Sequence, residues 1–326
     1  MATSANVVVA THGHCFDGTA SAALFTHLLR TVEPSLADAR FCYRGQAYDP
    51  GKNGVDPAIL EGAASSVILD FRYTASDALA WYFDHHASAF PSARERDHFE
   101  LLAARGRAFY DAEIGSCTKL VAKVAKETFG VDVSRFDELL RWAHMIDTAS
   151  FPTPEMAVDR REPEMKLCAV IEQHGDDALI TDLVGRLLER PLSEVAAAPD
   201  VVDRYGPIDA LHRGNVERIR SNEQLRGAVV FVDLLGSLTE TVTKFVTYAD
   251  HPESPYSVIV SRTNRRCKVS VGYNPWSKVA RAHDISKICE RYGGGGHPVV
   301  GAIALPPDVD ACRKVGLEIV KELGGD

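Results

Sequence analysis

The chain lacks several features that define whole classes of protein. It contains no run that approaches the ~20 consecutive apolar residues of a membrane-spanning helix, so we expect no membrane partner. Residues 1–10 carry neither a basic segment nor a long apolar segment, which argues against a signal peptide. The seven cysteines never form a Cys-x-x-Cys pair, which argues against a zinc ribbon or a disulfide framework. These absences predict a cytoplasmic protein with reduced thiols.

Basic charge is also scarce. The sequence has 36 Lys and Arg residues against 45 Asp and Glu residues, a net charge of −9 with histidine neutral. This balance argues against a protein that wraps duplex DNA in a basic coat, although a local basic patch remains compatible with it. The 326 residues, of which 45% are hydrophobic, suit two globular domains of roughly 150 residues each.

The first part of the chain alternates between strand-like and helix-like segments. Strand patterns occur at residues 6–10, 39–43, 66–71 and 78–83. Helical spacing of apolar residues occurs at residues 18–32, 116–129 and 135–146. This alternation predicts an α/β domain with a mostly parallel sheet flanked by helices.

The pattern changes after residue 220. Residues 152–222 are helical and charged, and we expect them to close the first domain and lead into a connector. Strand patterns then occur at 228–234, 257–260, 268–272 and 299–304, with helical patterns at 238–248 and 285–292. We therefore predict a first domain over 1–205, a connector over 206–225, and a smaller α+β domain over 226–326.

Side chains that can bind metal follow the predicted strands. They are His12, His14 and Asp17 after the first strand, Asp70 after residues 67–69, Asp84, His85 and His86 after residues 82–83, and Asp147 after a helical segment. Because the carboxyl ends of parallel strands share one edge of a sheet, these residues could converge. Oxygen and imidazole donors favour Mn²⁺, Fe²⁺ or Zn²⁺ over a structural four-cysteine zinc. A carboxylate between two such ions could hold a hydroxide for in-line attack on phosphorus.

Each of these residues also has a purely structural interpretation. An aspartate after a strand is most often a turn residue or a helix cap, so Asp147 or His12 taken alone indicates little. An adjacent Asp-His-His triplet after an apolar strand is rarer and favours metal binding.

A second group of residues lies near the end of the chain. Residues 291–298 read Arg-Tyr-Gly-Gly-Gly-Gly-His-Pro, and the exposed backbone of such a run could bind a phosphate. The structural alternative is a flexible hinge or turn. Between Val260 and His297 there are eight basic and two acidic residues, a net charge of +6 that favours an anion site.

Taken in order, these motifs resemble those of the DHH phosphoesterase superfamily, in the branch with a C-terminal DHHA1 domain. The triplet is Asp84-His85-His86, and the DHHA1 motif is Gly294-Gly295-Gly296-His297. The first motif corresponds to residues 12–18 and the second to residues 67–70, while Asp147 lies at the aspartate of the fourth. The resemblance covers about residues 7–304.

The resemblance implies a two-domain enzyme with its site in the cleft between the domains and two Mn²⁺ ions. His12 would bind the first ion, Asp70 would bridge both, and the second would be bound by Asp17, His85 and Asp147. Asp84 would support the site and His86 would face the substrate phosphate, and these two are the predicted catalytic residues. The distal part of a nucleotide would be held by Arg262, Gly294, Gly295, Gly296 and His297.

The first motif departs from the family pattern at Cys15, where many relatives carry an aspartate. Either the Cys15 thiolate or His14 could replace that ligand, or the first metal site could be weak. A softer donor would shift the preference from Mn²⁺ toward Zn²⁺ or Fe²⁺.

The resemblance favours a nano-RNase-like hydrolase that attacks the terminal phosphodiester of short RNA or DNA oligonucleotides or small nucleotides. The alternatives within the family are a 3′-phosphoadenosine-5′-phosphate phosphatase and a cyclic-dinucleotide phosphodiesterase. The acidic chain argues against an exonuclease for long strands.

The alternative from another class is a catalytically impaired nucleotide-binding protein, which Cys15 motivates. An oxidoreductase is disfavoured because the glycine run follows a helical segment, whereas a dinucleotide fingerprint follows a strand and opens a helix. Whether the chain forms a homodimer is left open.

Overall fold

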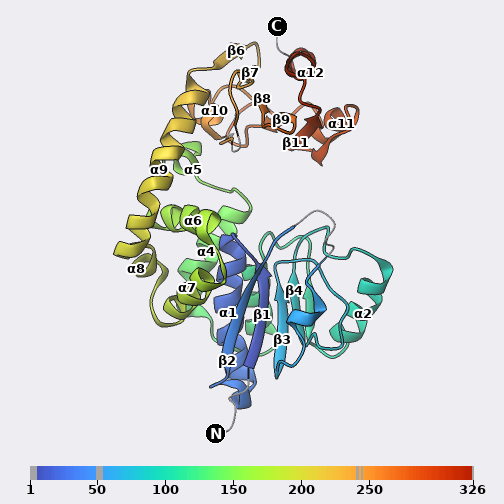
Figure 1. Cartoon of the computed structure of the whole chain (residues 1–326), viewed down its shortest axis with the longest axis vertical. Helices are drawn as coiled ribbons and strands as arrows, with labels where there is room; N and C mark the ends of the chain where they lie inside the picture. Colours follow the sequence, from blue (N-terminus) through green and yellow to red (C-terminus); the bar gives the residue numbers. More distant parts are fainter. Residues whose placement is uncertain (1–5, 49–53, 240–241, 244, 325–326) are drawn as a thin grey trace. The chain divides into compact units, whose positions relative to one another are not determined.

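A computed structural model of the chain describes residues 6–48, 54–239, 242–243 and 245–324. The chain forms two compact units, and each is discontinuous in sequence. The first unit comprises Met1–Ser150 and Arg161–Ile208, and the second comprises Phe151–Arg160 and Asp209–Asp326. Figure 1 labels most of the helices and strands of both units.

The first unit is built on a five-stranded sheet of order β2-β1-β3-β4-β5. Every neighbouring pair is parallel, which confirms the predicted α/β architecture. The strands are β1 (Asn6–His12), β2 (Arg40–Gln46), β3 (Ser65–Leu69), β4 (Trp81–Asp84) and β5 (Ala108–Tyr110). All five residues of β3 are buried, as expected for a central strand of a parallel sheet covered on both faces.

Helices cover both faces of this sheet, and neighbouring residues of β4 show which helix covers which face. Trp81 and Phe83 each pack at 5.8 Å against Phe25 of α1, whereas Tyr82 belongs to a core cluster with Leu102 of α2. Successive strand residues point to opposite faces, so α1 and α2 lie on opposite sides. The helices are α1 (Phe16–Val32), α2 (Ala93–Ala103), α3 (Cys117–Glu127), α4 (Asp137–Asp147), α6 (Pro163–His174), α7 (Asp177–Glu189) and α8 (Leu192–Ala196).

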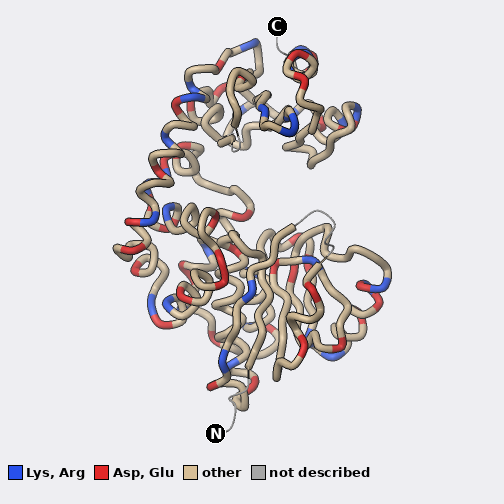
Figure 2. The backbone as a smooth tube through the Cα atoms, viewed as in Figure 1, with Lys and Arg blue, Asp and Glu red and all other residues tan. Residues whose placement is uncertain are grey.

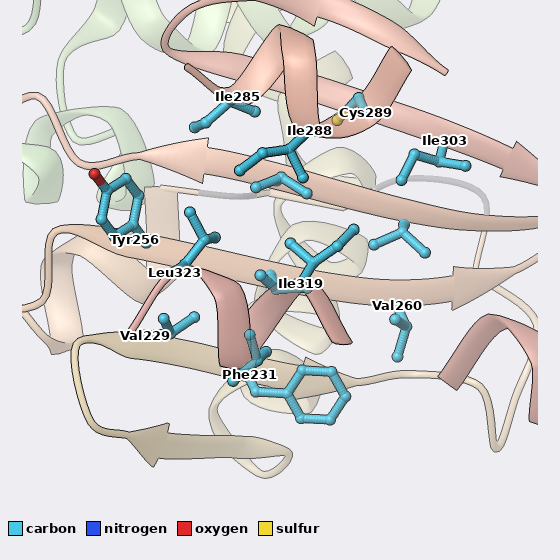
Figure 3. Close-up of a cluster of buried hydrophobic side chains, with 14 of the residues drawn as sticks. Val229, Phe231, Tyr256, Val260, Ile285, Ile288, Cys289, Ile303, Ile319 and Leu323 are labelled. Atoms are coloured by element: carbon cyan, nitrogen blue, oxygen red, sulfur yellow. The ribbon is translucent and has the colours of Figure 1, made fainter. Parts of the chain in front are cut away.

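The second unit is built on a mixed six-stranded sheet of order β10-β11-β9-β8-β7-β6. Only β7 and β8 pair in parallel among the strands described. The strands are β6 (Glu223–Arg226), β7 (Val229–Asp233), β8 (Tyr256–Arg262), β9 (Cys267–Tyr273), β10 (Gly295–His297) and β11 (Val300–Leu305). Figure 3 shows the apolar core between this sheet and the helices α11 (Ile285–Glu290) and α12 (Val309–Glu322). This mixed architecture confirms the predicted α+β class.

Residues 151–160 join the second unit, although the sequence analysis assigns them to the first domain. This segment contains α5 (Pro154–Asp159). The indole Nε1 of Trp276 donates to the carbonyl of Phe151 at 2.8 Å, and His212 Nε2 lies 2.6 Å from the carbonyl of Val158. These partners lie far along the chain, so local sequence patterns do not reveal them.

The helix α9 (Pro199–Arg220) occupies much of the predicted connector over 206–225. The division between the two units falls inside it, between Ile208 and Asp209. Acidic and basic residues alternate along α9 (Figure 2), and Arg213 forms an ion pair with Asp209 one turn away. This pattern is typical of a largely solvated helix.

The helix expected over 238–248 is shorter in the structure, where α10 covers Phe245–Asp250. Residues 240, 241 and 244 of that prediction lie outside the described residues. Thr239 instead donates its backbone N–H to the carbonyl of Arg262 at 2.8 Å and so extends the strand pairing beyond β7. Among the described residues, no helix is both long and apolar enough to cross a membrane. No disulfide joins the seven cysteines, all of which lie in the described part of the chain.

Candidate metal centre

Metal-capable side chains converge at the carboxyl edge of the parallel sheet. His12 ends β1, Asp70 directly follows β3, and Asp84 ends β4, and these three strands are neighbours in the sheet. Asp17 reaches the same place from the first turn of α1, and Asp147 from the last residue of α4. Residues far apart in sequence are therefore brought together by the register of the strands.

Asp70 lies at the centre of this cluster, and its two carboxylate oxygens face different partners. Oδ2 lies 3.5 Å from His12 Nδ1 and 3.5 Å from the Cys15 sulfur. Oδ1 lies 3.5 Å from His85 Nε2 and 3.7 Å from His86 Nδ1. The backbone of Asp70 is left-handed, with φ of +55°, and its N–H donates to the carbonyl of Phe83 at 2.9 Å. Aspartate tolerates this conformation better than most residues do.

His85 connects Asp70 to a second group of ligand atoms. Its Nε2 lies 3.3 Å from Asp147 Oδ2 and 4.0 Å from Asp17 Oδ2. The carboxylate of Asp17 accepts the backbone N–H groups of Cys117 at 2.7 Å and Thr118 at 3.1 Å. The amino end of α3 therefore fixes Asp17 in place.

Two residues of the first motif, Cys15 and His14, could replace the aspartate ligand that many relatives carry. The side chain of Cys15 lies in the cluster, whereas that of His14 lies outside it. Cys15 caps α1, where its sulfur accepts the N–H of Gly18 at 3.5 Å, and the thiol donates to Asp70. The sulfur forms a possible metal-binding group with His12 and Asp70, whose ligand atoms lie within 4.8 Å of one another. His14 is exposed, and its Nδ1 lies 3.2 Å from the carbonyl of Glu172.

Asp84 is fully buried and is occupied by hydrogen bonds. It accepts the backbone N–H of His85 at 2.9 Å, the hydroxyl of Tyr82 at 2.9 Å, and His86 Nδ1 at 2.8 Å. It joins none of the possible metal groups found among the described residues. Asp84 therefore orients the His86 ring and leaves the other ring nitrogen, Nε2, for an external partner.

Three carboxyl groups of the cluster, those of Asp17, Asp70 and Asp147, have pKa values shifted from the ordinary aspartate value. Burial raises the pKa of Asp147 to about 6, and the charge of Asp70 adds to this effect. Burial and the charges of Asp70 and Asp147 also raise the pKa of Asp17. Burial opposes ionisation of Asp70, but the nearby imidazoles of His12, His85 and His86 outweigh it and lower its pKa to about 2. The negative charges of these carboxylates are therefore only partly compensated by their neighbours, and a bound cation would compensate them further.

Three buried atoms of this cluster have no hydrogen-bond partner: His12 Nδ1, Asp70 Oδ1 and His85 Nε2. Buried polar atoms are nearly always paired, because desolvation without a partner is costly. Coordination of cations would give all three a partner. Imidazole nitrogens and carboxylate oxygens suit Mn²⁺, Fe²⁺ or Zn²⁺, so the residues present fit a metal centre.

The predicted substrate-binding residues all lie in the second unit. Arg262 ends β8, and its buried Nε has no hydrogen-bond partner. His297 is exposed at the end of β10. Gly294 precedes this short strand, and Gly295 and Gly296 belong to it. Because the strand pairs with β11, the glycine run is part of a hairpin and not a flexible hinge.

Two of the glycines are required by close backbone contact. A Cβ at Gly294 would lie 2.3 Å from the carbonyl oxygen of Ala302, and one at Gly296 would lie 2.2 Å from that of Val300. A Cβ at Gly295 would meet nothing within 4 Å. The run therefore has a packing function that the sequence alone did not suggest.

Two residues that the sequence patterns did not single out lie against the cluster of metal-capable side chains. Tyr48 packs edge-on against His12 with ring centroids 5.2 Å apart, and Arg72 lies over the Tyr48 ring. Burial, followed by the charges of Asp84 and Asp70, raises the pKa of Tyr48. The only sequence signal was the position of Arg72, two residues after Asp70.

Solved structures show which fold this is. No family model matches the sequence, and no curated protein matches it significantly. The chain is similar over 98% of its length to the pGpG-specific phosphodiesterase PggH from Vibrio cholerae, with a TM-score of 0.67, 18% identity and 100% of that chain covered. It is also similar to the DHH domain of a protein described as a member of a ribosomal protein family, with a TM-score of 0.61, 14% identity and 88% of that chain covered.

A third similar structure is RecJ from Thermus thermophilus in complex with Mn²⁺, with a TM-score of 0.57 and 11% identity. This match covers 98% of the present chain and 52% of RecJ. The fold of the chain is therefore that of DHH-domain proteins, as the resemblance of its motifs implies.

Proposed function

We propose that the chain is a metal-dependent phosphoesterase that hydrolyses short oligonucleotides or small nucleotides. The observation that carries this proposal is the position of Asp70, whose two oxygens face separate groups of buried nitrogen, oxygen and sulfur ligands. A carboxylate shared in this way is suited to a site with two metal ions. The partnerless atoms of His12, Asp70 and His85 support the same interpretation.

Each residue of the cluster takes a distinct role in this proposal. The first ion would be held by His12 and Cys15, the second by Asp17, His85 and Asp147, and Asp70 would be shared by both. Bound cations would lower the pKa of a water molecule and neutralise charge on the phosphate oxygens. Mn²⁺ is the proposed ion, in keeping with the similar RecJ structure, and the sulfur of Cys15 would broaden the choice toward Zn²⁺ or Fe²⁺.

His86 and Asp84 would act together on the substrate phosphate. Burial disfavours the charged imidazole, but the hydrogen bond and charge of Asp84 raise the pKa of His86 to about 9. In the metal-free protein the ring is therefore positively charged at neutral pH. Its Nε2 would donate to a phosphate oxygen as negative charge develops there, and Asp84 would hold the ring in position.

Nano-RNase-like attack on a terminal phosphodiester is the reaction we favour. The similarity to a pGpG-specific phosphodiesterase covers 98% of this chain and 100% of that one, and it supports a short nucleotide substrate. In the second unit, which we assign as a DHHA1 domain, Arg262, Gly294, Gly295, Gly296 and His297 would hold the part of the nucleotide that is remote from the reaction.

The test is product analysis with Mn²⁺ on pApA, pGpG, a labelled five-mer RNA and 3′-phosphoadenosine-5′-phosphate in parallel. Stepwise release of mononucleotides from the first three substrates is the expected result. Release of phosphate from the fourth alone would identify a nucleotide phosphatase instead. Inertness toward all four over hours, in folded protein with two bound ions per chain, would contradict hydrolase activity and favour a nucleotide-binding protein.

A further inference from the structure

Phe71, Tyr48 and Arg72 form a stack beside the cluster of metal-capable side chains, on the side of His12. The ring of Tyr48 lies parallel to that of Phe71, with centroids 4.4 Å apart and an interplanar angle of 28°. The guanidinium carbon of Arg72 lies 4.9 Å from the centroid of the Tyr48 ring. The edge contact of Tyr48 with His12 places the stack directly beside the cluster.

The two aromatic rings of the stack differ in exposure. Phe71 is 2% exposed and belongs to the core of the first unit, whereas Tyr48 is 40% exposed. Covering Phe71 does not by itself account for a tyrosine at position 48 that exposes so much of its ring to water. Tyr48 therefore presents an accessible ring beside the proposed reaction centre.

Arg72 has an aromatic partner, whereas some other arginines of the first unit have acidic ones. Arg44 pairs with Asp177 at 3.1 Å and Arg186 with Asp200 at 2.8 Å, whereas no acidic side chain among the described residues forms an ion pair with Arg72. Its backbone lies close to the cluster because Arg72 follows Asp70 by two residues, shortly after β3 ends. A guanidinium held against a ring keeps its N–H groups available, and their planar array matches phosphate geometry.

We propose that Arg72 and Tyr48 form a subsite for a second phosphate of the substrate, adjacent to the one that reacts. Arg72 binds this phosphate, and the exposed edge of the Tyr48 ring contacts the attached nucleoside, because Phe71 and Arg72 already lie against the ring. This inference rests on the proposed phosphoesterase function and deepens it, because it names the preferred substrates as those with a phosphate beyond the scissile group. The enzyme therefore prefers pApA to ApA.

The chain supplies a closely matched control for Arg72. Arg30, in the last turn of α1, lies 5.0 Å from the ring centroid of Phe41 near the start of β2. That pair has nearly the same geometry but lies at the opposite end of the strands from the metal cluster. Arg30→Gln therefore removes a cation from an aromatic ring without affecting the subsite.

The experiment measures kcat and KM for pApA and ApA with saturating Mn²⁺ in the wild type, Arg72→Gln and Arg30→Gln. Loss of a charged hydrogen bond raises the KM of Arg72→Gln for pApA by about tenfold to a hundredfold. Its KM for ApA stays unchanged, and Arg30→Gln keeps the wild-type preference. A wild type without preference for pApA, or equal losses on both substrates in Arg72→Gln, would overturn the inference.

Tyr48 is tested by two variants. Tyr48→Phe retains the ring and keeps the wild-type KM, whereas Tyr48→Ala raises KM for both dinucleotides. In Tyr48→Ala, the further substitution Arg72→Gln has a smaller effect than in the wild type, because Arg72 has lost the ring that orders it. Fully additive effects of the two substitutions would contradict a joint subsite.

Equilibrium binding separates this inference from the proposed function. Calorimetry compares adenosine 3′,5′-bisphosphate, the fourth compound of the product analysis, with adenosine 5′-monophosphate in wild type and Arg72→Gln loaded with Ca²⁺, a weaker Lewis acid than Mn²⁺, so that neither ligand is turned over during the titration. Tighter binding of the bisphosphate that is lost in Arg72→Gln supports the subsite even if no dinucleotide is hydrolysed. Equal affinity of the wild type for both ligands rejects the subsite even if hydrolysis is efficient.

Discussion

Asp70 combines three properties that are individually uncommon in one residue. It is fully buried, its backbone is left-handed, and each of its oxygens faces a different set of ligands. Because conformations of this kind cost free energy, they persist where the surroundings determine them closely. The neighbouring strands β1 and β4 provide those surroundings.

Asp70→Ala should abolish turnover, because both proposed metal positions lose a ligand. Metal content measured after dialysis should fall from two ions per chain to one or none. Asp38→Ala, at an exposed position of the same unit, is the control and should keep full metal content. More than a few per cent of wild-type activity in Asp70→Ala, with metal saturating, would remove Asp70 from the centre of the mechanism.

Cys15 can be tested by spectroscopy, independently of catalysis. Protein loaded with Co²⁺ should show a near-ultraviolet charge-transfer band if the thiolate binds metal, and Cys15→Ser should lack it. Cys42→Ser, on β2 of the same unit, should keep the band. If the wild type has no such band, Cys15 only caps α1 and the first ion has another ligand.

The pair of Asp84 and His86 predicts a titration at unusually high pH. With its pKa raised to about 9, the His86 ring of the metal-free protein should stay protonated below that pH and lose its proton as the pH rises through it. In Asp84→Asn the titration should move down toward the ordinary histidine value of 6.5, because the main stabilising charge is gone. Nuclear magnetic resonance of the imidazole protons measures both, and identical titrations would show that Asp84 does not control this ring.

At the scale of elements, the sequence predicted those features that depend on local patterns. The parallel strands and the convergence of His12, Asp70 and His85 followed from apolar runs that end in polar side chains. The convergence of these metal-capable side chains was predictable because strand order in a parallel sheet brings such ends together. The stack of Tyr48 and Arg72 was not, because it depends on how a segment after β2 meets the end of β3.

The hairpin of β10 and β11 shows the other limit of sequence patterns. A glycine run has no side chains from which pairing could be inferred, so a strand at Gly295–His297 was not expected. The requirement for glycine comes from carbonyl groups of β11, which are close in space to Gly294 and Gly296. Only the three-dimensional structure distinguishes the required glycines from the tolerant one.

Gly294→Ala and Gly295→Ala therefore form a matched pair. The added methyl group at Gly294 meets backbone that cannot move freely, so this variant should destabilise the second unit by about 1–3 kcal/mol. Gly295→Ala should unfold at the wild-type denaturant concentration. Chemical unfolding followed by fluorescence measures both in a Trp81→Phe, Trp142→Phe background, where Trp276 of the second unit is the remaining tryptophan. Equal stability of the two variants would contradict the proposed packing role of Gly294.

At the scale of the whole molecule, the acidic cluster links metal binding to the stability of the first unit alone. Mn²⁺ at a hundredfold excess over its dissociation constant should stabilise that unit by about 2.7 kcal/mol per ion. Calorimetric melting should show an upward shift of one transition that chelation reverses, and Asp70→Ala should not show it. A shift of both units by the same amount, or of neither, would count against metal binding within the first unit.

The path of the chain between the two units has a consequence for inheritance and engineering. The polypeptide passes from one unit to the other three times, between residues 150 and 151, 160 and 161, and 208 and 209. Only residues 148–150 separate Asp147 from the segment that belongs to the second unit. A single recombination junction therefore cannot exchange one unit for that of another protein. To transplant the proposed metal centre without the second unit, residues 151–160 would have to be carried along or replaced.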